Sequence, residues 1–296
     1  HAGPVSSVSI SHDGRLPLLL TASSDRTARM WFGSRAEAVL VFSGMNYGGG
    51  GGDASPRKKA PIRASSAGKM APKPNPAFPA DVKQCSFFYM DKFVLLTSAS
   101  TLALYNYTLD PLADSSNDLR RLRNESKYKL VRAFDMPYHT VTAMTCVTSF
   151  LSNLVLLAGS DRSIAVMDLA AGRTARMITD ATARPVHTLA MPAASDFAGL
   201  SPDAYDLFLT SSQDGGVHLW DLRAMRPIRR FDSHSSRSHK VGASLSPCLR
   251  YVAAGSEDRL VYLYDIGSGS CVHRLRGAKD VVTSVCFNPR VRLVHV

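Results

Sequence analysis

Four aspartates occupy equivalent positions ahead of large apolar residues, and a carboxylate at such a site could act as an acid, a base or a metal ligand. The pairs are Asp25 with Trp31, Asp161 with Met167, Asp214 with Trp220, and Asp258 with Tyr264. Catalysis or metal binding would require further titratable side chains beside each carboxylate. The nine histidines are scattered and show no metal-ligand spacing. We therefore expect no catalytic residue, no metal site and no cofactor.

The wider sequence also lacks the motifs of common enzyme classes. It contains no Gly-x-Ser-x-Gly, no His-Glu-x-x-His and no Walker loop, because glycines 48–52 are not followed by Gly-Lys-Ser/Thr. The five cysteines are irregularly spaced, which indicates reduced thiols and an intracellular location. We expect the cytoplasm, with nuclear or ciliary locations left open. No apolar run approaches the roughly 18–20 residues of a membrane span.

The elements that position these aspartates repeat along the chain. Each copy consists of small residues, an Asp-centred turn and an alternating apolar run, as in "TSSQDGGVHLWD" at 210–221. Asp214 precedes Asp258 by 44 residues and follows Asp161 by 53 residues. A period of roughly 40–45 residues is typical of four-stranded propeller blades.

On these four copies and the strand-like segments before them, the chain resembles the WD-repeat proteins. The resemblance implies an all-β WD40 β-propeller of four-stranded antiparallel blades. About five blades and a partial one would be present, as part of a seven-bladed ring. In that family the indole N–H of the Trp donates to a Ser or Thr on the next strand, and the hydrogen bonds continue through a His to the turn Asp.

The resemblance assigns a structural role to the residues at matching positions. Numbered as blades along the chain, with a divergent second blade between the first two copies, the first blade supplies His1, Thr21, Asp25 and Trp31. The fourth supplies Thr210, Asp214 and Trp220, with Thr182 in place of the His. The third retains His139 and Asp161 but has Leu157 and Met167, and the fifth retains Asp258, with His234, Ala254 and Tyr264. We therefore interpret the repeated aspartates as part of the fold and not of an active site.

The blade boundaries follow from the same pattern, and we expect a longer protein than this sequence. Blade 1 covers 1–43 and would lack its outer strand, which should precede His1. Residues 44–81 would form a disordered basic low-complexity insert. The later units are a divergent blade 2 at 82–135 with an insert at 110–127, blade 3 at 136–178, blade 4 at 179–231, blade 5 at 232–275 and a partial blade 6 at 276–296.

The formal charge of +11 is concentrated in two segments. Residues 44–81 carry six basic and two acidic residues, and residues 120–132 carry six basic residues and one acidic residue. The remainder is nearly neutral, which argues against a nucleic-acid-binding face on the folded part.

Three partner classes remain open. The implied function is a non-catalytic protein-interaction scaffold with an unidentified protein partner, for which Arg26, Arg162 and Arg259 would form a cationic rim. "WDLR" at 220–223 resembles the docking motif of cullin-4 ubiquitin ligase substrate receptors, in which Arg223 would contact the ligase adaptor and Asp221 would orient it. The basic inserts could instead contact RNA or acidic lipids electrostatically, without specific nucleic-acid recognition.

Overall fold

A computed structural model describes most of the chain. The described residues are 1–11, 17–33, 37–44, 78–109, 126–148, 152–192, 204 and 206–288. All strands in them belong to five four-stranded antiparallel sheets. This confirms the predicted all-β organisation in four-stranded blades. No helix in the described part is long and apolar enough to cross a membrane.

Each sheet is built from four consecutive strands. The first contains β1 (Val5–Ile10), β2 (Leu18–Ser23), β3 (Ala28–Phe32) and β4 (Ala38–Phe42). The second contains β5 (Val82–Phe88), β6 (Phe93–Ser98), β7 (Thr101–Thr108) and β8 (Lys127–Asp135). The third contains β9 (Val141–Cys146), β10 (Leu154–Gly159), β11 (Ile164–Asp168) and β12 (Arg173–Ile178). The fourth contains β13 (Val186–Ala190), β14 (Leu207–Ser212), β15 (Gly216–Asp221) and β16 (Arg226–Phe231). The fifth contains β17 (Ala243–Leu245), β18 (Tyr251–Gly255), β19 (Val261–Asp265) and β20 (Cys271–Leu275).

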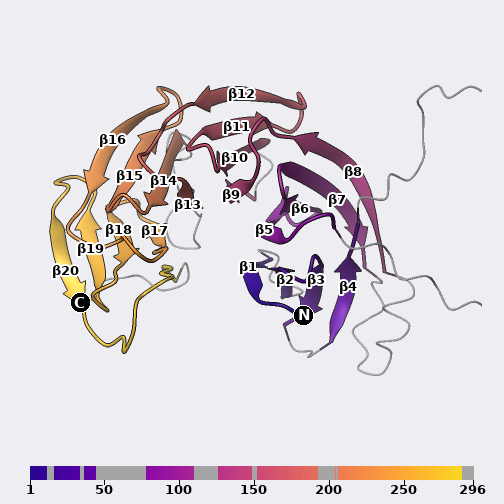
Figure 1. Cartoon of the computed structure of the whole chain (residues 1–296), viewed down its shortest axis with the longest axis horizontal. Helices are drawn as coiled ribbons and strands as arrows, with labels where there is room; N and C mark the ends of the chain where they lie inside the picture. The colour runs from indigo at the N-terminus through magenta and orange to yellow at the C-terminus, as the bar shows by residue number, and fades with distance from the viewer. Residues whose placement is uncertain are drawn as a thin grey trace, which may run out of the picture.

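The sheets follow one another around an open arc, with the first strand of each on the inside and the fourth on the outside (Figure 1). Neighbouring sheets meet through their inner strands, because β5 lies against β1 and β9, and β13 lies against β9 and β17. One apolar cluster fills each seam between neighbouring sheets. The strands in the middle of each sheet are buried because they are covered on both faces. β10, for example, has five fully buried residues in the run LVLLAG.

The outer strands differ from the inner ones in both register and exposure. In every sheet a β-bulge interrupts the pairing of the third and fourth strands at one equivalent position, such as Val166/Met167 in the third sheet and Leu219/Trp220 in the fourth. A bulge increases the local twist of a strand. β12 and β16 are exposed along almost their whole length, since they pair with a neighbour on one side only.

The structure corrects the expectation that blade 1 lacks its outer strand. β4, with the sequence AVLVF, pairs with β3 and completes the first sheet from within the chain. Its apolar residues are buried against the second sheet, where Phe42 packs on Tyr105 and Tyr128. The sequence analysis did not identify β4, because this segment lacks the alternation of polar and apolar residues that indicates a half-buried strand.

The boundary of the second insert also needs correction. It was expected to continue to residue 127, whereas β8 begins at Lys127 and carries basic residues on an exposed strand. Residues 45–77 and 110–125, where the basic inserts are predicted, lie outside the described residues. Residues 276–288 form no strand, but the Val282 N–H donates to the Ser256 carbonyl and the Thr283 carbonyl accepts from Gly242. The sixth blade and the seven-bladed ring stay predictions.

Candidate functional site

The four turn aspartates share one local geometry. In each, Oδ1 accepts a hydrogen bond from the backbone N–H two residues further on, at 3.0–3.2 Å. The donors are Thr27, Ser163, Gly216 and Leu260. This pattern closes the turn between the second and third strands of a sheet. The carboxylates are therefore occupied by backbone and neighbouring hydroxyl groups, and each belongs to a different blade.

In the first blade, a complete chain of hydrogen bonds connects the indole to the carboxylate. Trp31 Nε1 donates to the Thr21 hydroxyl at 2.9 Å, and the same hydroxyl lies 2.7 Å from His1 Nε2. His1 Nδ1 lies 2.9 Å from Asp25 Oδ2. A neutral imidazole that donates from Nδ1 and accepts at Nε2 satisfies every group in this chain. The His1 side chain is only 5% exposed, so the network ties the segment before β1 to the β2–β3 turn.

Several hydrogen bonds stabilise the ionised form of Asp25. Burial favours its neutral form, but hydrogen bonds from the Thr27 hydroxyl and from the backbone N–H groups of Ala2 and Thr27 outweigh that effect. The positive charge of Arg29, at 3.6 Å, acts in the same direction. The pKa of Asp25 is consequently lowered, and the group stays ionised.

The fourth blade retains only half of this chain. Trp220 Nε1 donates to the buried Thr210 hydroxyl at 2.9 Å, the same distance as in the first blade. Thr182 instead donates to the Arg184 carbonyl and makes no contact with Asp214 among the described residues. His218 lies opposite Thr210 in the sheet register, and burial lowers its pKa, so its imidazole stays neutral.

The structure corrects the role expected for His139 in the third blade. His139 is exposed and makes no hydrogen bond to Asp161 among the described residues. Its neighbour Tyr138 is buried instead, beside the β10–β11 turn, and its ring packs against Gly159. With Leu157 on β10 in place of a hydroxyl residue, no polar chain needs an imidazole, and the loop buries an aromatic ring. Burial raises the pKa of Tyr138, and the charge of Asp161 adds to the effect.

The fifth blade replaces the indole chain by two tyrosine contacts. The Tyr264 hydroxyl lies 3.0 Å from Nδ1 of the buried His234. The Tyr262 hydroxyl donates to Asp258 Oδ2 at 2.6 Å. Histidine and aspartate thus retain their positions, but each pairs with a separate phenol. The residues of the predicted network occur together in blade 1, blade 4 keeps only the Trp–Thr hydrogen bond, and blade 5 has an altered form.

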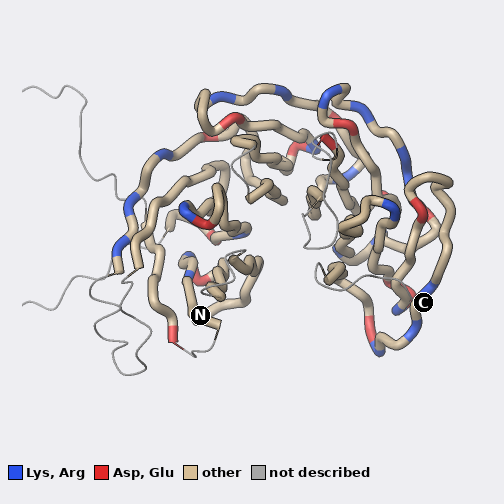
Figure 2. Tube along the Cα trace, turned by 180° about the vertical axis from the view of Figure 1, so that it is seen from behind, with Lys and Arg blue, Asp and Glu red and all other residues tan. Residues whose placement is uncertain are grey.

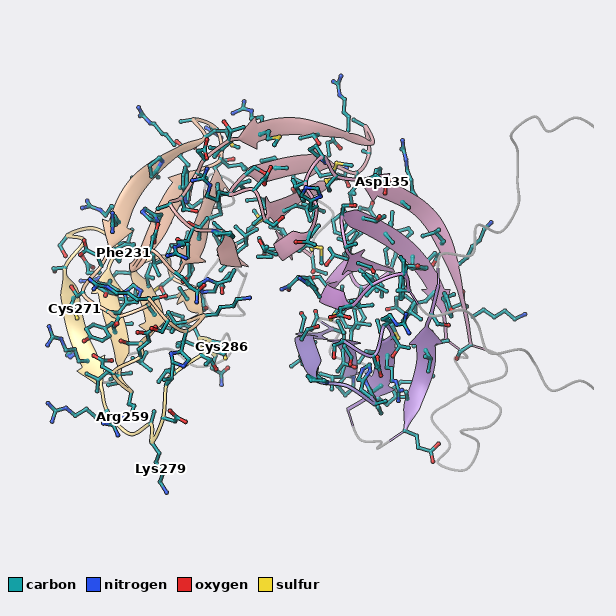
Figure 3. The ribbon with its side chains drawn as sticks, viewed as in Figure 1. Asp135, Phe231, Arg259, Cys271, Lys279 and Cys286 are labelled. Carbon is teal, nitrogen blue, oxygen red and sulfur yellow. The ribbon has the colours of Figure 1, made fainter. Side chains whose placement is uncertain are left out.

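The residue after the turn aspartate has left-handed backbone geometry in all four copies. The φ values are 61° for Arg26, 70° for Arg162, 67° for Arg259 and 88° for Gly215. Glycine adopts this region without strain, whereas other residues do so at a cost of roughly 1–2 kcal/mol. All three arginines are exposed, and Arg259 extends away from the sheets (Figure 3). Arg162 forms an ion pair with the exposed Asp180 at 2.5 Å.

The "WDLR" segment lies at the seam between the third and fourth sheets. Asp221 Oδ1 accepts hydrogen bonds from the backbone N–H groups of Arg223 and Ala224, as Asp168 does for the equivalent turn of the third blade. The Arg223 guanidinium is instead held by Asp206, with Nε at 2.6 Å from the carboxylate. Asp221 therefore shapes the turn, and Asp206 is the acid that orients Arg223.

A pocket of about 170 Å³ lies beside Arg223. Its apolar walls come from both sheets at the seam, and its rim carries Arg176, Asp206 and Arg223. The apolar lining residues are Leu154, Val166, Ala175 and Leu222.

Sequence reasoning missed a set of arginines that cross the blade seams. Arg176 on β12 donates to the carbonyl oxygens of Leu222 and Arg223 in the next blade. Arg229 on β16 donates to the Gly267 and Ser268 carbonyls of the blade after that, at 2.5 and 3.4 Å. The guanidinium of Arg132 on β8 likewise packs against Gly172. Each arginine therefore fastens an outer strand to the third-to-fourth-strand turn of the following sheet.

A regular spacing could have revealed two of these arginines. Arg176 and Arg229 each stand fifteen residues after the turn aspartate of their own blade. In the sheet register, Arg132, Arg176 and Arg229 are equivalent, because they pair with Leu104, Val166 and Leu219 immediately before the bulge.

Glu257 forms a second unanticipated centre at the start of the turn between β18 and β19. Its Oε1 accepts the backbone N–H groups of Arg237, Ser238 and His239 at 2.6–2.8 Å, and its Oε2 accepts the Ser235 hydroxyl at 3.0 Å. The backbone hydrogen bond from His239 is the largest cause of a pKa lowered to about 2. The loop at 235–239 is thus wrapped around one ionised carboxylate. Among the described residues, no group of three His, Cys, Asp or Glu side chains could hold a metal ion.

Comparison with known proteins agrees with this geometry. Residues 1–31 and 225–265 match the family model described as "WD domain, G-beta repeat". These two segments contain the turn aspartates of the first and fifth blades. These two segments are similar to WD40 repeats. The chain's five four-stranded sheets have the organisation of WD40 propeller blades.

Curated relatives share short stretches of sequence with this chain. Coatomer subunit beta'-2 of Arabidopsis thaliana is 28% identical over 91 residues, which is 31% of this chain and 10% of that protein. The WD repeat domain-containing protein 83 homolog of Dictyostelium discoideum is 26% identical over 82 residues, 28% of this chain and 25% of that protein. Transcription initiation factor TFIID subunit 5 of Caenorhabditis elegans is 34% identical over 89 residues, 29% of this chain and 13% of that protein. The matches therefore span at most a quarter of each of these relatives.

Proposed function

We propose that this chain is a non-catalytic platform that binds an acidic surface of a protein partner through Arg26, Arg162 and Arg259. These three residues, called the arginine rim below, occupy equivalent turns between the second and third strands of their sheets. Because every sheet runs from the inner to the outer strand in the same sense, equivalent turns lie on one face of the arc. WD40-repeat proteins generally act as protein-interaction scaffolds.

The observation that carries the proposal is the backbone strain at the rim. Gly215 fills the equivalent turn of the fourth blade without strain, so the turn itself does not need an arginine. Strained positions of this kind concentrate where function retains them. The guanidinium is also suited to carboxylate recognition, since it offers several donors in a planar fork. An acidic partner surface would match Arg26 and Arg259 directly and would compete with Asp180 for Arg162.

The names of the relatives are consistent with a role as a subunit of a larger protein assembly. Two of them are named as subunits, one of coatomer and one of a transcription initiation factor. We extend to this chain the general role of a subunit that holds other proteins.

Proximity labelling in cells tests the rim. The wild type is compared with a variant that carries Arg26→Glu, Arg162→Glu and Arg259→Glu, with matched expression. We expect the variant to lose one or more labelled proteins that have acidic surfaces, since reversed charge repels them. As a control, Arg237→Glu changes one exposed charge outside the rim. An identical set of labelled proteins for wild type and rim variant would reject the proposal.

A second candidate function is favoured by the setting of Arg223. Its guanidinium is oriented by Asp206 at 2.6 Å while its side chain stays 69% exposed beside the seam pocket. A substrate receptor that docks on the adaptor of a cullin-4 ubiquitin ligase through 220–223 would use such an arginine. Affinity purification with wild type and Arg223→Ala tests this candidate. It predicts adaptor recovery only with the wild type, whereas no recovery or equal recovery would exclude it.

The basic inserts support a third hypothesis, contact with RNA or an acidic lipid. The residues concerned lie outside the described structure, so the hypothesis rests on their composition of Lys, Arg, Gly and Pro. Binding to RNA or lipid that disappears when residues 53–75 are deleted would support it, and unchanged binding would exclude this insert.

We also infer a closer relationship within the family. The strings "SFFYMDKFVLLTSASTLALYNY" at 86–107, "NLVLLAGSDRSIAVMDLAAG" at 153–172 and "LFLTSSQDGGVHLWDLR" at 207–223 resemble WD repeat-containing protein 27. Sequencing the full-length transcript tests this inference. Flanking regions that align with that protein in the same order would support it, and flanks that align with a different WD40-repeat protein would refute it.

A further inference from the structure

The outer strands of the last four sheets carry a one-sided charge. β8, β12, β16 and β20 together contain nine Lys and Arg residues and a single acid, Asp135. All nine cations are exposed, and Lys and Arg follow the outer contour of the arc (Figure 2). Charged residues on an edge strand, Lys especially, discourage pairing with another sheet. Seven of the nine cations here are Arg, whose planar guanidinium also suits carboxylate recognition, so these strands can serve a second purpose.

The cations are also arranged in register between blades. Lys129, Arg173 and Arg226 occupy equivalent positions, because they pair with Asn106, Asp168 and Asp221 at the matching point of each third strand. We call these three cations the outer belt. The structure contains no ion pair between any of them and a described acid. Asp168 and Asp221 lie opposite two of them, yet both carboxylates accept backbone N–H groups of the adjoining turns.

The belt is distinct from the seam arginines, which lie further along the same strands. The guanidinium groups of Arg176 and Arg229 are engaged by carbonyls of the next blade. The belt residues make no such contact among the described residues, so their charges are available to a partner.

Exposed aliphatic side chains alternate with these cations. Val131 is 51% exposed, Met177 41%, Ile228 50%, Val272 44% and Leu275 43%, so each of these four outer strands carries at least one exposed large apolar side chain. No Phe, Tyr or Trp side chain is exposed on these strands, because Tyr128, Phe134 and Phe231 are at least partly buried. Single-stranded nucleic acids are held largely by stacking on aromatic rings, so the belt lacks the feature that they require.

The curvature of the belt further restricts the class of partner that can bind it. The outer strands lie on the convex side of the arc (Figure 1), so a flat membrane or a straight nucleic-acid duplex would touch one blade at a time. A flexible chain can follow the curve and meet equivalent cations on successive blades. Acidic residues on that chain would pair with the belt, and aliphatic residues would cover the exposed Val, Met and Ile side chains.

We propose that the outer belt, together with the aliphatic side chains beside it, binds an extended acidic segment of a partner protein that contains aliphatic residues. The segment crosses the outer strands of blades 2, 3 and 4. This surface is independent of the arginine rim, which lies on the turns at one face of the arc, and a single partner or two partners could use both surfaces.

Fluorescence anisotropy tests the proposal with a labelled peptide of about 20 residues composed of Glu, Asp and Leu, which spans up to about 65 Å when extended. The belt variant carries Lys129→Glu, Arg173→Glu and Arg226→Glu. We expect it to bind the peptide at least about tenfold more weakly than the wild type at low salt. The rim variant, with the same change of net charge, should bind the peptide within about twofold of the wild type.

Folding and the alternative ligands are checked in parallel. A milder belt variant with Gln at the three positions should give intermediate affinity, and its circular dichroism should match the wild type. Absence of peptide binding by the wild type, or equal binding by wild type and belt variant, overturns the proposal. Stronger belt-dependent binding of a single-stranded oligonucleotide or of phosphatidylserine vesicles overturns the assignment to a polypeptide. Loss of peptide binding in the rim variant alone would support the proposed function and refute the belt.

Discussion

Replacing Glu257 by Gln removes the charge that organises the loop at 235–239. In the wild type, Oε1 accepts three backbone N–H groups and Oε2 accepts a hydroxyl. The pKa of Glu257 is lowered from 4.5 to about 2. A shift of that size corresponds to about 3 kcal/mol, which we reduce to about 1–2 kcal/mol because the loop faces solvent. Gln keeps the size of the side chain but cannot act as a charged acceptor.

The pH dependence follows from the direction of the shift. Because the pKa is lower in the folded state, the ionised carboxylate stabilises the loop fully above pH 4.5. That stabilisation is lost as the pH falls from 4.5 towards 2, where the folded state also binds the proton. The difference between wild type and Glu257→Gln should therefore be greatest at neutral pH and become smaller below about pH 4.

Hydrogen exchange measured by mass spectrometry gives the test a local readout. At pH 7 we expect the amides of Arg237, Ser238 and His239 to exchange roughly 5- to 30-fold faster in Glu257→Gln, as a loss of about 1–2 kcal/mol requires. Asp180→Asn, which removes an exposed carboxylate, serves as the control and should leave these amides unchanged. Unaltered exchange in Glu257→Gln would show that the carboxylate does not organise the loop.

Three further changes test other contacts. Thr210→Val leaves the Trp220 indole N–H without its acceptor. In urea titrations it should lower the free energy of unfolding by about 1–3 kcal/mol, and a smaller loss would contradict the stabilising role of that hydrogen bond. Arg176→Gln removes the hydrogen bonds to the turn of the next blade. In the same titration it should lower the free energy of unfolding by about 0.5–1 kcal/mol, and an unchanged midpoint would mean that this contact does not stabilise the fold. Gly255→Ala places a methyl group against the Val282 carbonyl oxygen and should speed hydrogen exchange in residues 280–288; protection equal to the wild type would show that the segment is held elsewhere.

The local parts of this structure were predictable from the sequence. An Asp followed by alternating apolar residues specifies a turn and a strand within about ten residues, and four copies at similar spacing indicate four-stranded sheets. The Trp-to-Thr hydrogen bonds of blades 1 and 4 follow from the same local spacing, since the two residues stand opposite one another on paired strands. The arrangement of the fold therefore depends on signals that lie close together in the chain.

The parts that were missed depend on contacts between distant segments. Whether His139 or Tyr138 enters the interior is decided by the space that Gly159 leaves, and not by the spacing from Asp161. The guanidinium of Arg223 is oriented by Asp206, which lies immediately before β14, whereas Arg223 follows β15. β4 lacks polar alternation because its apolar residues pack against the next sheet. In each case, the residue that determines the side-chain position belongs to a neighbouring loop, strand or blade.

The charge distribution shows a related limit. A nearly neutral remainder argued against a charged face on the fold. In the structure, the acids lie mainly in turns and the outer strands carry cations almost exclusively. Net charge does not reveal such a separation, because it sums over all faces of the molecule.

The central claim is that the arginine rim is kept for a partner at the expense of stability. The most direct measurement combines urea denaturation and partner recovery for a variant carrying Arg26→Gly, Arg162→Gly and Arg259→Gly. Glycine relieves the left-handed backbone strain at each site, but it also adds conformational entropy to the unfolded chain. The net effect should raise the free energy of unfolding by about 0.5–1 kcal/mol per site. The account predicts a more stable protein that loses its acidic partner, whereas full partner recovery by the variant would contradict it.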